Sequence, residues 1–92
     1  MRLKIFLDVA SYDCLRKYHS SDVTNAAVLL GSTRVIDCDD MEARELLLVA
    51  RSHCPNAAGR IAEASVGRLS VFGNQSAVRE WSDGVEPLRV RR

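Results

Sequence analysis

The segment from Thr33 to Pro55 constrains the fold more than any other part of this chain. It reads TRVIDCDDMEARELLLVARSHCP, in which a short apolar run ends in an acidic cluster and a strongly helix-forming run follows at once. Asp39 or Asp40 is suited to cap that helix, because aspartate accepts hydrogen bonds from the first backbone N–H groups. Proline disfavours helical backbone in the residue before it. We therefore predict a strand over 33–38 that leads into a capped helix ending at the proline, the building step of an α/β fold.

Length and composition predict one small domain over residues 1–92. The chain has 92 residues, of which 47% are hydrophobic and only 5% are aromatic. A chain of this length buries roughly 60–65% of the surface that its unfolded form exposes, so its core is thin. A thin core of small aliphatic side chains leaves little margin of stability, which makes association with a second copy worth testing.

Hydrophobic periodicity predicts the remaining elements. Residues 1–9 have the alternation of a strand. Residues 11–30 are predicted to be helical in two pieces with a break at 19–22, because the second piece carries apolar residues at helical spacing and Gly31 follows as a stop. The alanine-rich run 56–66 is predicted to be a further helix, and 68–72 a third strand.

The C-terminal part allows two interpretations. Residues 74–81 can form a short helix that begins at Asn74, which we favour. Alternatively, Asp83-Gly84 can form a type I′ turn between strands 77–82 and 85–90. In either case 85–91 is predicted to be an edge strand, because Pro87 cannot donate to a sheet.

These elements predict an α/β fold with a small, mainly parallel sheet of three to four strands, covered by helices. The order is β-α-α-β-α-α-β, followed by the C-terminal edge strand. Strands 2–9 and 33–38 are joined by a helical crossover, for which parallel pairing is the strong default.

Under this parallel arrangement, Asp8 and Asp37 lie at the same edge of the sheet. Open α/β sheets bind their ligands at that edge. With Asp39 beside them, their carboxylates could hold Mg²⁺ and support phosphoryl transfer or phosphodiester hydrolysis. The competing interpretation is that these aspartates only form turns and helix caps.

The opening residues KIFLDVASYDCL resemble the first strand and first acidic residue of PIN-type nuclease domains. This resemblance covers some twelve residues and implies a metal-binding role for Asp8. Such nucleases need further acidic residues on later helices, for which the chain offers only Glu63 and Asp83. The activity is therefore not assigned from the resemblance.

Three cysteines, Cys14, Cys38 and Cys54, form an odd set without a metal-binding spacing such as CxxC. We expect free structural thiols in a reducing cytoplasm. Neither His19 near Cys14 nor His53 beside Cys54 has the spacing of a catalytic base. No apolar stretch approaches the roughly 20 residues needed to cross a bilayer, and we expect no membrane partner.

The formal net charge of +1 argues against a dedicated polyanion-binding protein. The exception is the basic C-terminus, where Arg89, Arg91 and Arg92 predict at most a weak nucleic-acid contact. No phosphate-binding or hydrolase motif occurs in the chain.

The leading functional hypothesis is a non-enzymatic interaction or regulatory module that forms a homodimer or binds another protein. It rests on a second apolar site at Met41 and Leu48, on the far side of the helix from its buried stripe, and on the predicted exposed C-terminal strand. The first alternative is a Mg²⁺-dependent phosphohydrolase or nuclease; under the leading hypothesis no cofactor is expected. The second alternative is an accessory protein that binds nucleic acid through its basic C-terminus.

Overall fold

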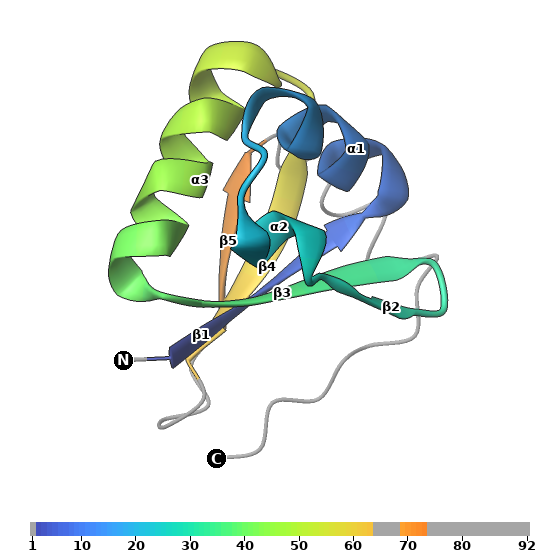
Figure 1. Ribbon diagram of the computed structural model, residues 1–92, viewed down its shortest axis with the longest axis vertical. Coiled ribbons are helices and arrows are strands. Elements are labelled where there is room, and N and C mark those ends of the chain that lie inside the picture. Colours follow the sequence, from blue (N-terminus) through green and yellow to red (C-terminus); the bar gives the residue numbers. More distant parts are fainter. Residues whose placement is uncertain (1, 64–68, 74–92) are drawn as a thin grey trace.

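The computed structural model describes residues 2–63 and 69–73. Five strands form one sheet: β1 (Arg2–Asp8), β2 (Val28–Leu30), β3 (Thr33–Asp39), β4 (Ala58–Glu63) and β5 (Leu69–Gly73). The helices are α1 (Val9–Tyr18), α2 (Asp22–Asn25) and α3 (Asp40–His53). The strand order across the sheet is β2-β3-β1-β4-β5, and every pair of neighbours is antiparallel (Figure 1). The first four strands and their connecting helices follow the β-α-β-β-α-β order of split βαβ units.

The predicted mainly parallel sheet is therefore wrong. β3 pairs with β1 in antiparallel register, with Ile5 opposite Ile36 and Asp8 opposite Thr33. The reason is a strand that the sequence patterns did not indicate. The chain returns from α1 and α2 along β2 at the edge of the sheet, turns at Gly31-Ser32, and comes back along β3. This hairpin reverses the direction of β3 relative to β1.

Two predicted helices are also corrected. The first is the helix predicted over 23–30. In the structure, helix α2 ends at Asn25, and the apolar run Val28–Leu30 forms β2. A short apolar run fits a strand or a buried helix equally well by periodicity alone. The second, over 56–66, is replaced by β4 up to Glu63. Its small residues suit the middle of the sheet, since an added Cβ at Gly59 would lie 2.6 Å from the backbone oxygen of Phe6.

Several local predictions are confirmed. Strands occur at 2–8, 33–39 and 69–73, and α3 begins at Asp40 and ends at His53. Asp39 caps α3 in a capping box with Glu42: the Glu42 N–H donates to Asp39 Oδ1 at 2.8 Å, and the Asp39 N–H donates to Glu42 Oε1 at 3.0 Å. The predicted helix or hairpin at 74–84 and the edge strand at 85–91 lie outside the described residues.

The main core lies between one face of the sheet and the helices α1 and α3. Partners in an antiparallel pair share a face, so Leu3, Ile5 and Leu7 of β1 lie beside Ile36 and Cys38 of β3. These side chains pack with buried residues of both helices: Tyr12, Leu15, Ala43, Leu46 and Ala50. Phe6, Val35 and Ala62 form a smaller buried cluster on the opposite face.

Helix α2 is fixed to α1 by a buried hydrogen bond, which positions the start of β2. The Tyr12 hydroxyl donates to the backbone oxygen of Thr24, whose side chain is fully buried. The Thr24 hydroxyl in turn donates to the His19 carbonyl at 2.9 Å. On the same face of the sheet, the Arg34 guanidinium of β3 lies 5.0 Å from the centre of the Tyr12 ring. These contacts hold the hairpin against the first helix.

The substitution Gly59→Ala separates the observed strand from the predicted helix by the sign of its effect. In a helix interior, alanine in place of glycine stabilises by about 1 kcal/mol. In β4 the added methyl group meets the Phe6 backbone and the Phe72 ring, so we expect destabilisation by roughly 1–3 kcal/mol. Urea denaturation of both proteins measures the difference. A more stable Gly59→Ala protein would contradict the assignment of β4.

Candidate functional site

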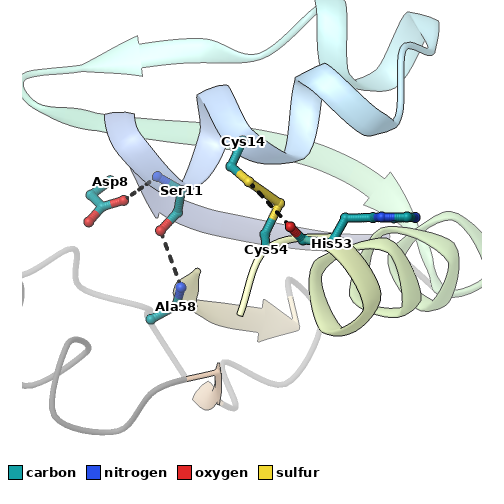
Figure 2. Close-up of a disulfide and its surroundings, with 6 residues drawn as sticks. All are labelled: Asp8, Ser11, Cys14, His53, Cys54 and Ala58. Atoms are coloured by element: carbon teal, nitrogen blue, oxygen red, sulfur yellow. Dashed lines mark hydrogen bonds between the residues drawn. A yellow bond between two sulfur atoms is a disulfide. The ribbon is translucent and has the colours of Figure 1, made fainter. Parts of the chain in front are cut away.

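Asp8 lies at the junction between β1 and α1, where it caps the helix. Its Oδ1 accepts a hydrogen bond from the Ser11 backbone N–H at 2.7 Å (Figure 2). The Ser11 hydroxyl accepts from the Ala58 N–H at 3.2 Å, which ties the helix start to β4. The capping alternative for Asp8 is thus the one that the structure shows.

Asp37 and Asp39 lie toward the opposite end of β1. Asp37 is paired in register with Lys4, four residues from Asp8, which corresponds to about 13 Å along the strand. Asp37 accepts from the Arg2 guanidinium at 2.9 Å, and both side chains are exposed. Asp39 caps α3, and its hydrogen bond from the Glu42 backbone lowers the pKa of its carboxyl.

The predicted Mg²⁺ ligands Asp8, Asp37 and Asp39 are therefore not brought together. The prediction required the carboxyl ends of both strands to lie at the same end of the sheet. Because β1 and β3 are antiparallel, their carboxyl ends lie at opposite ends. Within residues 2–63 and 69–73, no three acidic, histidine or cysteine side chains are grouped closely enough to hold a metal ion.

The predicted interface residues Met41 and Leu48 lie on the outer side of α3. Both are strongly exposed, at 72% and 61%. Their role as an interface stays a prediction. The basic residues Arg89, Arg91 and Arg92 lie outside the described part of the chain.

Cys14 and Cys54 form a disulfide, which corrects the expectation of free thiols at both positions. Cys14 lies within α1, and Cys54 is the residue after α3; their Cα atoms are 6.1 Å apart (Figure 2). A separation of 40 residues gave no sign of this pairing, because antiparallel packing of the two helices brings them together. Cys38 is the one cysteine that stays free, and it is completely buried.

The surroundings of the disulfide are those of a structural cross-link. Cys54 caps the C-terminus of α3, where the partial negative charge of the helix end opposes a thiolate. The two neighbouring histidines are engaged elsewhere: His53 stacks on Tyr18 at 4.5 Å between ring centres, and His19 lies 3.6 Å from Glu45. All three contacts join α1 to α3, so the helix pair is held at several points along its length.

Shallow hollows flank Cys54-Pro55. One, of about 270 Å³, is lined by Asp8, Ser11, Cys14 and Asn56 among others. One carboxylate oxygen of Asp8 caps α1, and the Ser11 hydroxyl accepts from the Ala58 N–H (Figure 2). Among the described residues that line this hollow and its neighbour, no polar side-chain atom is both buried and without a hydrogen-bond partner. These hollows therefore present no built ligand site.

The outer edge of β2 is the most distinctive surface of the described structure. Val28, Leu29 and Leu30 are 58%, 51% and 48% exposed, although all three are large and apolar. β2 is the first strand of the sheet and pairs only with β3 among the described strands. Among the described strands, the backbone groups on its outer edge have no partner, and apolar side chains lie on both of its faces. The helical spacing of Val23, Ala26, Ala27 and Leu30 hides this strand in the sequence. The signal that indicates it is the contiguous apolar triplet before a glycine.

No helix in the described part of the chain is both long and apolar enough to span a bilayer. The chain matches no protein-family model, and neither a curated protein nor a solved structure is similar to it.

Reduction of the disulfide should destabilise the fold without destroying it. Cross-linking residues 40 apart stabilises by about 4 kcal/mol in the chain-entropy model, equivalent to a Tm change of roughly 15–30 °C at this size. Thermal unfolding with and without a thiol reductant measures this change. The double variant Cys14→Ser/Cys54→Ser is the control, and its Tm should not respond to reductant. An unchanged Tm for the reduced wild-type protein would contradict the cross-link.

Cys38 should resist alkylation in the native protein. Burial raises the pKa of its thiol from 9.0 to about 11, with Glu42 adding to the effect, so only about 0.1% is thiolate at pH 8. Iodoacetamide at pH 8 should modify Cys38 only after unfolding, as mass spectrometry of the native and denatured protein can show. Because the folded pKa lies above the unfolded value, stability should fall as the pH rises from 9 through 11. Rapid native labelling would contradict the burial.

Proposed function

We propose that this protein is a non-enzymatic interaction module that self-associates through the outer edge of β2. The observation that carries the proposal is the half-exposed apolar triplet Val28–Leu30 on an edge strand. Natural sheets usually protect such edges with lysine, proline, a bulge or a covering segment. None of the residues from Val23 to Thr33 is charged or proline.

An apolar edge without charge or proline suits β-strand addition, in which a second strand pairs with the edge through its backbone. A second copy of the same chain is the occupant that the sequence favours. When two uncharged edges meet, no like charges are brought together, whereas a charged partner strand would find no complementary charge between Val23 and Thr33. Closed two-fold dimers are also the commonest assemblies of soluble chains.

The affinity should be modest. A three-residue strand on each side buries much less than the roughly 1,600 Å² of a standard protein interface. We therefore expect a monomer–dimer equilibrium with a Kd of roughly tens to hundreds of micromolar, and not a permanent dimer.

No described geometry supports the enzymatic alternative as strongly, since Asp8 lies at one end of the β1–β3 pair and Asp37 and Asp39 lie toward the other. The cytoplasmic location stays a proposal that the disulfide makes testable. Disulfides are rare in reducing cytoplasm, so a cytoplasmic protein should carry Cys14 and Cys54 as thiols in cells. Alkylation of cell extracts under acid quench distinguishes the two forms.

Light scattering over a concentration series tests the proposal, with Leu29→Lys as the main variant. A lysine on the edge should abolish dimer formation up to the highest concentration reached, because pairing would bury its charge. Its fold should be unaffected, since Leu29 is half exposed.

Leu48→Lys is the matched control, and it also tests the predicted α3 interface. We expect it to dimerise like the wild type. Dissociation by Leu48→Lys and not by Leu29→Lys would move the interface to α3. A wild-type protein that stays monomeric at millimolar concentration would overturn the proposal altogether.

A further inference from the structure

The hairpin determines which backbone groups of β2 face its free edge. Leu30 and Thr33 are paired across the two-residue turn Gly31-Ser32, and Gly31 has a φ of 61°, as the first position of a type II′ turn requires. The residues that close such a turn exchange both of their backbone hydrogen bonds. Antiparallel pairs then alternate along the ladder.

This alternation singles out Leu29. Leu30 and Val28 direct their N–H and C=O groups to β3, whereas Leu29, opposite Arg34, directs both groups outward. Within β2, Leu29 is therefore the one residue whose outward groups can form a hydrogen-bonded pair with another strand.

We propose that two copies of the chain pair antiparallel through β2, with Leu29 opposite Leu29 of the second copy on a two-fold axis. This inference rests on the proposed function and specifies its geometry. In an antiparallel ladder, a hydrogen-bonded pair needs outward groups on both residues. Because only Leu29 offers them within the strand, only the self-paired register satisfies both chains. The two Leu29 residues exchange two backbone hydrogen bonds, and the two five-stranded sheets join into one of ten strands.

The side chains agree with this register. Val28 of each copy lies opposite Leu30 of the other, on the face of the sheet away from the helices, and the two Leu29 side chains meet on the helix-covered face. The paired region is β2 itself, Val28–Leu30, and no charged residue lies between Val23 and Thr33. A shift of the register by one residue would place outward groups opposite inward ones and lose the hydrogen bonds.

Cysteine cross-linking tests the register. Leu29→Cys places two cysteines opposite each other with Cα atoms about 5.5 Å apart, within the range that a disulfide spans. We expect a covalent dimer under mild oxidation at concentrations where the wild type associates. Ser32→Cys is the matched control: it lies in the adjacent turn, and its two copies would be about 20 Å apart in this register. It should stay monomeric.

A proline substitution gives a second, independent readout. Leu29→Pro removes an N–H that only the second copy uses, so it should abolish association while the fold, followed by circular dichroism and Tm, is kept. Val28→Pro removes an N–H bonded to β3 and should lower the Tm of the monomer itself.

Three outcomes separate the inference from the proposed function. The register and the self-association are both supported if Leu29→Cys cross-links, Ser32→Cys does not, and Leu29→Pro is monomeric. A wild type that dimerises while Leu29→Cys fails to cross-link, or while Leu29→Pro still dimerises, overturns this register but leaves self-association standing. A wild type that never dimerises overturns both.

Discussion

The two-residue turn at Gly31-Ser32 is the constraint on which the rest of this structure depends. It is the shortest connection that two antiparallel strands can have, and the positive φ of Gly31 gives it the twist that adjoining strands need. The turn makes β2 and β3 a hairpin, so the chain leaves the first helix along the edge of the sheet and returns along its interior. The direction of β3, the position of its carboxyl end and the existence of an exposed edge strand all follow from it.

The direction of β3 decides which chemistry is available to the sheet. Had β3 run parallel to β1, its carboxylates would have joined Asp8 at one edge. Antiparallel pairing instead leaves Asp8 to cap α1, and leaves Asp37 and Asp39 to an ion pair with Arg2 and the cap of α3. The same reversal makes α1 and α3 run in opposite directions, which brings Cys14 to Cys54. The cross-link braces the helical layer, and β2 forms the edge of the described sheet beyond β3.

The accuracy of the sequence predictions depended on whether the deciding interactions were local. Helix α3 was predicted because its signals are local. Its cap at Asp39 and its end before Pro55 depend on residues a few positions apart. The strand at β2 was missed because Val28–Leu30 follows a short helix whose apolar spacing it continues. β4 was missed because alanine and glycine favour it only through close contact with β1 and β5, which lie far away in the sequence. The disulfide and the separation of the carboxylates depend on strand direction, which no local pattern encodes.

Amide hydrogen exchange of β2 as a function of protein concentration tests the account most directly. If the hairpin and the two-fold pairing are right, the amides of Val28 and Leu30 are protected at every concentration, because they bond to β3. The Leu29 amide should exchange freely in dilute solution and become protected as the protein associates. Equal protection of all three amides in dilute solution would indicate a helix or a strand already paired on both edges. A Leu29 amide that stays unprotected while the protein dimerises would show that association uses another surface.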